Sequence, residues 1–285
     1  AYFMINPFPG SDQTLFTVLF YDWLRPMAVD LKTGQDLGAL VAAGSAGEAR
    51  LVIGAILGLL LLAYVFKSAE FRGSFDNILG GLVVGLAVLA AWYVTSNVQI
   101  DADGEMYSLG DYYEEWDMLA ESDAGKPSQG RPLSPQSFTF ISPMGQTVAY
   151  TAGGFDRSLL TFGVMAFLGV VAGSLLWSLL SRSFRFEWFS SFGDFISHLV
   201  GAILMGFGGV LALGCTVGQA ITGISTLAAG SFITFVAIVL GSALTMKVQY
   251  YKLVYEEEAT FGKALVAALA DLHLLPNALR KLDKV

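Results

Sequence analysis

The stretch "GGVLALGCTVGQAITGISTLAAGS", from Gly208 to Ser231, is a polar interruption in an otherwise apolar part of the chain. It collects glycines, hydroxyl side chains, a glutamine and Cys215, the only cysteine of the protein. Between residues 195 and 246 the only side chain that can carry a charge is that of His198. This run is longer than two membrane spans of roughly 20 residues each, so about a dozen residues are left over for a different structure.

We interpret the surplus as a re-entrant loop over residues 214–230. Non-helical backbone inside a bilayer survives only where protein or a watery cavity satisfies its amides and carbonyls, so a polar, glycine-broken insert predicts a loop that lines a pathway. Glycine and hydroxyl residues also let membrane helices pack closely, and that alternative stays open. Cys215 is accordingly either a small buried hydrophobe or a functional thiol.

The composition of the whole chain is that of a membrane protein. Of its 285 residues, 54% are hydrophobic and 14% are charged, whereas soluble domains carry roughly 25% charged residues. Five apolar runs approach or exceed the length of a membrane-spanning helix, which predicts an all-α, multi-pass helix bundle. The runs cover residues 51–66, 78–96, 158–180, 195–213 and 231–246.

Lysine and arginine residues in the short connections alternate onto one side, which the positive-inside rule makes cytoplasmic. The long connection between the second and third runs, rich in Asp and Glu, then lies outside. We therefore predict five parts: residues 1–50, an N-terminal segment with a short interfacial or re-entrant helix; residues 51–96, two spans; residues 97–157, an acidic external loop; residues 158–250, three spans with the re-entrant loop; and residues 251–285, a cytoplasmic amphipathic tail.

Two segments outside the predicted spans have helical spacing. In the external loop Tyr112, Trp116 and Leu119 would form one face of a short helix on the membrane surface, although a solvated loop is an equal alternative. In the tail, four apolar residues lie opposite Lys263 and Asp271, which predicts an amphipathic helix. We favour a helix that caps the bundle over one that docks a partner or lies in the membrane interface. The four are Phe261, Leu265, Leu269 and Leu272.

The sequence contains no motif that is typical of a soluble enzyme. It has no phosphate-binding loop, no dinucleotide-binding glycine pattern and no recognisable nucleophile–base spacing. His198 and His273 lie on different segments, and "DADGE" at residues 101–105 lacks oxygen ligands that a calcium loop requires. A net charge of −8 without a basic stripe argues against nucleic acid. We expect no enzymatic activity, no cofactor and no metal site.

Three stretches resemble one known family. "HLVGAILMGFGGVLALGCTVGQAITGISTLAAGS" is similar to the second-half signature of the YeeE/YedE family of sulfur-compound (thiosulfate) transporters. "DNILGGLVVGLAVLAAWYVTS" and "SPQSFTFISPMGQ" resemble the same family in the same order. The likeness extends over residues 75–246 and is specific at residues 214–218.

The resemblance implies a multi-pass protein of the bacterial inner (plasma) membrane, forming half or more of an inverted-repeat transporter. It implies uptake of thiosulfate or a related sulfur anion along a central path, with Cys215 passing the anion inward through weak S–H hydrogen bonds. Helix N-termini and free amides can replace the water around such an anion. The candidate substrate-binding residues are Cys215, Gly214, Thr216, Gly218, Gln219, Ser225 and Thr226.

Residues 1–76 depart from the family pattern, because they contain no cysteine and no matching glycine motif. We therefore expect an N-terminal half with a second cysteine loop, supplied by an upstream extension of the polypeptide or by a separate chain. A different class of function also remains open, namely a non-transporting membrane subunit that anchors a soluble sulfur-handling or redox partner. A cytoplasmic sulfurtransferase would be such a partner.

Overall fold

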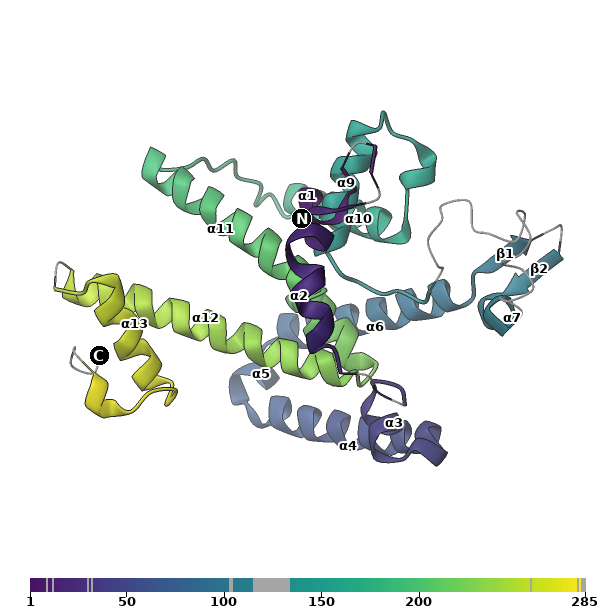
Figure 1. Ribbon diagram of the computed structural model, residues 1–285, viewed down its shortest axis with the longest axis horizontal. Helices are drawn as coiled ribbons and strands as arrows, with labels where there is room; N and C mark the ends of the chain where they lie inside the picture. Colours follow the sequence, from purple (N-terminus) through teal and green to yellow (C-terminus); the bar gives the residue numbers. More distant parts are fainter. Residues whose placement is uncertain are drawn as a thin grey trace. The chain divides into compact units, whose positions relative to one another are not determined.

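The computed structural model describes residues 1–8, 10, 11, 13–29, 31, 33–102, 105–114, 134–256, 258–280 and 282 (Figure 1). The chain divides into two compact units, Ala1–Ala228 and Ala229–Val285. The first unit contains four of the long helices and most of the short elements, and the second contains the last long helix and the C-terminal tail.

Among the described residues, five helices are long and apolar enough to cross a membrane, which confirms the prediction of a mainly helical chain with five candidate spans. At most 11% of the apolar window of any of these helices is buried, so their apolar side chains are largely exposed. Lipid solvates such apolar faces as well as protein does. The five helices are α4 (Ala46–Lys67), α6 (Phe75–Ser96), α10 (Phe162–Leu180), α11 (Phe192–Leu211) and α12 (Ala229–Tyr255).

Hydroxyl side chains fix where three of the long helices begin. Ser74 accepts a hydrogen bond from the backbone N–H of Asn77 at the start of α6, and Thr161 accepts one from Val164 at the start of α10. Ser191 does the same for α11. Such caps satisfy amides that the first helical turn leaves unpaired. The cap at Thr161 explains why α10 begins at Phe162, although its apolar run starts at residue 158.

The N-terminal segment and the connections contain several short elements. In residues 1–50 these are α1 (Tyr2–Ile5), a π-helical turn (Thr17–Tyr21), α2 (Asp22–Leu24), a 3-10 turn (Arg25–Met27), α3 (Leu37–Val41) and a second 3-10 turn (Ala43–Ser45). Further along the first unit lie α5 (Ala69–Gly73), α7 (Leu109–Glu114), α9 (Ile141–Ala152) and a 3-10 turn (Arg157–Leu159).

The connection after α6 contains a small antiparallel hairpin, which adds a two-stranded sheet to an otherwise helical chain. Strand β1 (Gln99–Ala102) pairs with β2 (Glu105–Ser108). Ile100 of the hairpin and Leu109 and Tyr112 of α7 form a small buried cluster, in which Tyr112 is 0% exposed. Tyr112 therefore packs inward against the hairpin and does not face a membrane surface. Trp116 and Leu119 lie outside the described residues.

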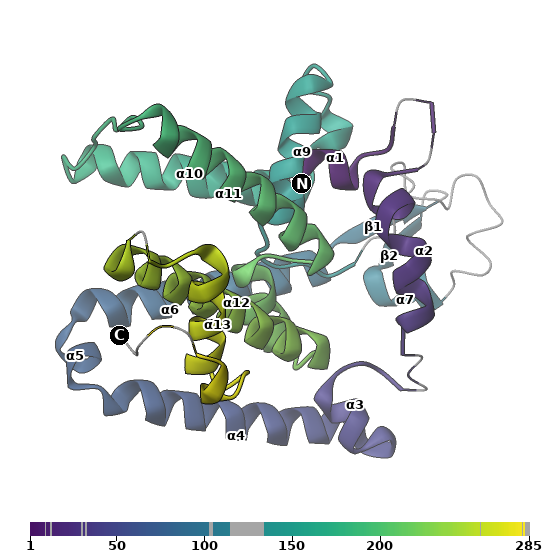
Figure 2. The ribbon, with the colours of Figure 1, turned by 60° about the vertical axis from the view of Figure 1, so that its left-hand side comes forward.

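Helix α9 is central to the first unit, because it packs against α1, α10 and α11. Figure 2 shows α1 alongside α9. Met4 of α1, Ile141 of α9 and Val210 of α11 form a buried cluster, against which Cys215 also packs. The position of α9 therefore connects the N-terminal segment to the region around the cysteine.

Two adjacent glycines of α11 provide a test of this packing. A Cβ atom at Gly209 would lie 2.7 Å from Cδ1 of Ile141, whereas one at Gly208 would meet nothing within 4 Å. We expect Gly209→Ala to destabilise the protein by about 1–3 kcal/mol through overpacking. Gly208→Ala should be neutral or slightly stabilising, because alanine favours helices. Thermal unfolding in detergent measures both, and equal Tm values for the two variants would contradict the packing of α9 on α11.

In the second unit, α13 (Phe261–Asp271) packs on α12, and a 3-10 turn (Asn277–Leu279) follows. The face of α13 in contact differs from the one that the apolar spacing suggests. Phe261 is 65% exposed, and the buried face consists of Ala264, Ala267 and Ala268. Alanines let the two helices approach closely.

Asp271, which the sequence pattern places on the exposed polar face of α13, has a side chain that is only 2% exposed. It pairs with Lys247 at 2.8 Å, accepts a hydrogen bond from the hydroxyl of Tyr251 at 3.0 Å and contacts Arg280. A buried carboxylate requires such partners. The tail is therefore held on α12 by a charged cluster as well as by its alanines.

Candidate functional site

The segment that follows α11, residues 212–228, is bounded by two sharp turns and contains a π-helical stretch, Val217–Gly223. At its start Leu213 has a φ of 54°, in the left-handed region. The N–H of Gly214 donates to the carbonyl of Gly209 at 2.9 Å, and that of Leu213 donates to Val210 at 3.0 Å. These are the two bonds of a Schellman motif, whose left-handed position is usually a glycine. The motif ends α11 at Leu211, before the end of its apolar run.

The far end of the segment repeats this arrangement. Leu227 has a φ of 58°, and the N–H groups of Leu227 and Ala228 donate to Ile224 and Gly223. A left-handed residue other than glycine costs roughly 1–2 kcal/mol. Such strain persists where the surrounding structure fixes it, and it clusters at functional sites. π-Helical turns are rare in proteins overall, and those that occur often lie at functional sites.

The end of the segment is tied to the region before α4. The N–H of Leu37 donates to the carbonyl of Leu227 at 2.9 Å. The neighbouring Asp36 caps α3 by accepting from the N–H of Ala39 at 3.0 Å. Its two carboxylate oxygens also pair with Arg50 of α4 at 2.8 and 2.9 Å. The hydrogen bond from Arg50, followed by that from Ala39, lowers the pKa of Asp36 from 3.8 to about 2.

This ion pair predicts a pH dependence of stability. The pKa of Asp36 is lower in the folded protein than in the unfolded one. Its carboxylate therefore adds to the free energy of unfolding fully above pH 3.8, and this contribution is lost as the pH falls through about 2. We expect Asp36→Asn, which retains a capping side chain, to lower Tm at pH 5 to 7. The difference from the wild type should disappear near pH 2. A difference in Tm that does not change between pH 5 and pH 2 would contradict a role for the charge.

The thiol of Cys215 lies where the N-terminal ends of two helical segments meet. The N–H of Gly218 donates to Sγ of Cys215 at 3.5 Å, and the N–H groups of Val217 and Phe140 and the side chain of Thr139 lie near the sulfur. Cys215 directly precedes one helical segment and Phe140 directly precedes α9. Amides at helix N-termini carry partial positive charge and favour anions. The surroundings of the half-buried thiol therefore suit a negatively charged group.

Phe140 and Thr139 belong to an extended stretch, residues 134–140, which we call the crossing segment. The hydroxyl of Thr95 on α6 accepts from the N–H of Gln136 at 2.9 Å. Ser137 donates to the carbonyl of Val88 on α6 at 3.1 Å, and Thr222 donates to the carbonyl of Phe138 at 2.6 Å. These bonds join the crossing segment to α6 on one side and to the π-helical stretch on the other.

Gly218 makes the close approach of these segments possible. A Cβ atom at Gly218 would lie 2.6 Å from Oγ1 of Thr139 and 3.1 Å from its Cβ. Real Cβ atoms do not approach other heavy atoms that closely, so the hydroxyl of Thr139 occupies the space where a side chain of residue 218 would lie. The glycine predicted as part of the cysteine loop is therefore needed for the contact with the crossing segment.

The structure brings some of the predicted site residues together. Gly214 and Gly218 lie beside Cys215 in the turn and in the first helical residues. Gln219 donates from Nε2 to the carbonyl of Ala212 at 2.6 Å and packs on Gly214, so its amide closes the turn. Gln219 thereby stabilises the turn that directly precedes Cys215. Thr216 is exposed.

Ser225 and Thr226 are at the other end of the helical stretch. The hydroxyl of Ser225 accepts from Nε1 of Trp92 at 3.1 Å and donates to the carbonyl of Thr222 at 2.6 Å. Thr226 donates to the carbonyl of Gly223 at 2.8 Å. Both hydroxyls therefore stabilise the helical stretch and its contact with α6. The structure does not gather them with Cys215.

Sequence reasoning missed two neighbours of the thiol, Thr139 and the N–H of Phe140. The available signal was the motif "SPQSFTFISPMGQ", which contains both residues. The motif has no charged side chain, histidine or cysteine that would mark it as part of a site. Among the described residues no group of three or more His, Cys, Asp or Glu side chains could hold a metal ion.

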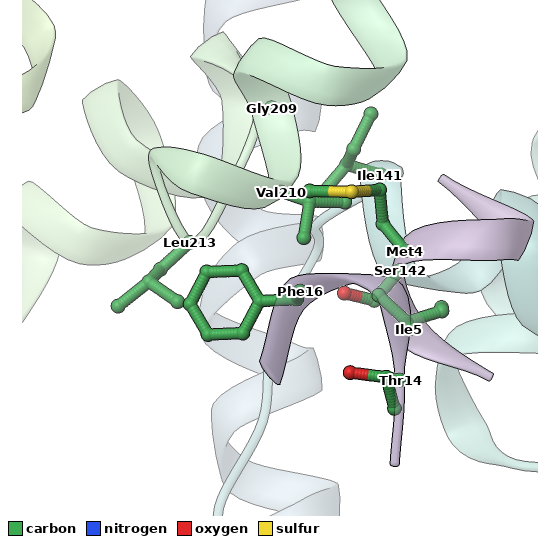
Figure 3. A pocket seen from close by; sticks show the side chains of 9 residues that line it. All are labelled: Met4, Ile5, Thr14, Phe16, Ile141, Ser142, Gly209, Val210 and Leu213. Carbon is green, nitrogen blue, oxygen red and sulfur yellow. The ribbon is translucent and has the colours of Figure 1, made fainter. Parts of the chain in front are cut away.

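A cavity of about 220 Å³ adjoins the site (Figure 3). It is mainly apolar, with the hydroxyls of Thr14 and Ser142 as its polar side chains. Ile141 in its wall follows Phe140 directly, and Leu213 lies two residues before Cys215. The full lining is Met4, Ile5, Thr14, Phe16, Ile141, Ser142, Gly209, Val210 and Leu213.

Comparisons with known proteins agree on one class of transport protein. The sequence model of the sulphur transport family, a family of transporters, matches residues 60–244. The chain is 25% identical over 171 residues to the thiosulfate transporter TsuA of Escherichia coli (strain K12), a match that covers 60% of this chain and 38% of that protein. No solved structure matches. Because the family match covers more than half of its residues, the chain belongs to the sulphur transport family.

Proposed function

We propose that this protein takes up thiosulfate or a related sulfur-containing anion across the bacterial inner membrane. The observation that carries the proposal is the half-buried thiol of Cys215, held among the backbone amides of Phe140, Val217 and Gly218. Membership of the sulphur transport family and the similarity to a thiosulfate transporter support it.

The chemistry of the segment suits passage of an anion better than its retention. Fixed backbone amides can replace part of the anion's hydration shell, and a thiol adds a weak donor suited to a terminal sulfur. No lysine or arginine occurs between residues 195 and 246, so no full positive charge there holds the anion. The same stretch has no Asp or Glu to relay protons. Facilitated passage is therefore the simplest mechanism.

In this proposal residues 214–230 form a re-entrant loop that brings Cys215 into the membrane as part of the wall of the path. The polar backbone of this segment must be shielded from lipid by other protein segments. Residues 97–157 lie outside the cytoplasm, whereas the connection 181–194 and the tail from Lys252 lie inside it, as the placement of arginines and lysines predicts.

Uptake of radiolabelled thiosulfate, in cells that lack other routes for sulfate and thiosulfate, tests the proposal. We expect accumulation that depends on the protein and that unlabelled thiosulfate suppresses. If the protein instead co-purifies with a stoichiometric soluble sulfur-handling or redox partner and supports no flux, it is an anchoring subunit and the transport proposal is wrong.

A further inference from the structure

We propose that Thr139 is a specificity-determining residue of this site, whose hydroxyl binds an oxygen of the anion while the thiol of Cys215 binds its terminal sulfur. The inference rests on the proposed function and adds to it a second side chain that contacts the substrate. It assigns to the site an anion that presents both an oxygen and a terminal sulfur.

The placement of Thr139 is the first support. Its Oγ1 lies 2.6 Å from the position that a Cβ of Gly218 would take, and the N–H of the same Gly218 donates to the sulfur of Cys215 at 3.5 Å. The next residue, Phe140, directly precedes α9, and its N–H lies near the same sulfur. A hydroxyl, a thiol and backbone amides from two helical N-termini thus lie around one point.

The rigidity of this arrangement is the second support. The two residues before Thr139 are fixed by hydrogen bonds, one from Ser137 to Val88 at 3.1 Å and one from Thr222 to Phe138 at 2.6 Å. Threonine is branched at Cβ and restricted in χ1, so a fixed backbone leaves its hydroxyl few directions. Both Thr139 and Cys215 are only half-buried, so an anion can reach them.

The chemistry of the two donors gives the selectivity. A hydroxyl donates strongly to oxygen, whereas a thiol is a weak donor and a soft partner. A site built to hydrogen-bond one group of a ligand rejects analogues that lack this group. Sulfate can bind the hydroxyl but offers no terminal sulfur to the thiol. Thiosulfate can satisfy both groups at once.

Cys215 is the only cysteine of the 285-residue sequence, and alkylation of the protein in membranes is measured at this residue, by mass spectrometry of the peptide that contains it. The probe is N-ethylmaleimide, and the quantity measured is the thiosulfate concentration that halves the rate of modification. We expect Thr139→Val, which removes the hydroxyl but keeps the branched shape, to raise this concentration about tenfold or more, since a hydrogen bond to a charged group corresponds to at least that factor. Thr139→Ser should stay within about twofold of the wild type.

The rate without thiosulfate separates binding from packing. Each half-protecting concentration is measured relative to the variant's own rate without thiosulfate, because the hydroxyl of Thr139 also lies beside the thiol. A changed rate without thiosulfate together with an unchanged half-protecting concentration would show a merely structural role and overturn the inference. Equal protection of wild type and Thr139→Val would also overturn it while leaving the transport proposal intact. If thiosulfate fails to protect even the wild type, both proposals are wrong. Should Thr139→Val fail to accumulate in membranes, Thr139→Ala makes the same test.

Discussion

Replacement of Cys215 by alanine is expected to lower the initial rate of thiosulfate uptake by about 10- to 100-fold, the factor that corresponds to loss of a hydrogen bond to a charged group. The change leaves the amides of Phe140, Val217 and Gly218 in place and removes only the soft donor. Because the thiol is half-buried and small, the variant should still fold and accumulate in the membrane. Uptake at thiosulfate concentrations well below saturation measures the effect.

Cys215→Ser is the matched control, since it retains a donor of similar size at the same place. We expect this variant to lose less uptake than Cys215→Ala, because a hydroxyl still reaches the anion but suits its sulfur less well. Wild-type rates in Cys215→Ala would show that the residue only fills space against Met4, Ile141 and Val210, as a small hydrophobe does.

Gly218→Ala is expected to reduce uptake about tenfold or more through a steric effect on the crossing segment, because overpacking costs roughly 1–3 kcal/mol. The new methyl group would meet the hydroxyl of Thr139 at 2.6 Å, so either Thr139 or the helical stretch must move. Either movement would increase the distance between Thr139 and the helical stretch that begins beside Cys215. The measurement is the same uptake assay, normalised to the amount of protein in the membrane.

Gly230→Ala is the control for this substitution, because a Cβ atom at Gly230 would meet nothing within 4 Å. It should leave uptake at the wild-type level. If Gly218→Ala also transports at that level, the contact between Thr139 and the π-helical stretch is not needed for function, and our interpretation of the glycine is wrong.

The spans could be predicted from the sequence because a bilayer imposes their length and apolarity directly. Their ends could be predicted less well, because caps and turns decide them. Thr161 delays the start of α10, and the Schellman turn at Leu213 ends α11 before its apolar run does. A leucine in a left-handed position leaves no signal in hydropathy, whereas a glycine there would have been recognised.

The candidate site was predicted in part. The cysteine and its glycines stand out in sequence, since they are neighbours along the chain. Thr139 comes from a segment far away along the chain, and only the bonds of the crossing segment to α6 and to Thr222 bring it to the thiol. A binding role for Gln219 stays a prediction; the hydrogen bond from its Nε2 to the carbonyl of Ala212 could not be predicted, because it depends on the turn at the end of α11. The buried face of α13 was missed because alanines carry little weight in an apolar pattern.

The depth of Cys215 in the membrane tests the central claim, that residues 214–230 re-enter the bilayer and line the path. A spin label on Cys215, the only cysteine of the 285-residue sequence, can be compared with the same label at Ser183→Cys in a Cys215→Ser background. Residue 183 lies in the exposed connection after α10. Power saturation with oxygen and with a water-soluble nickel chelate reports depth. We predict that the label at Cys215 is accessible to oxygen and shielded from the chelate relative to residue 183. Equal access of the chelate to both labels would place the segment at the membrane surface and contradict the account.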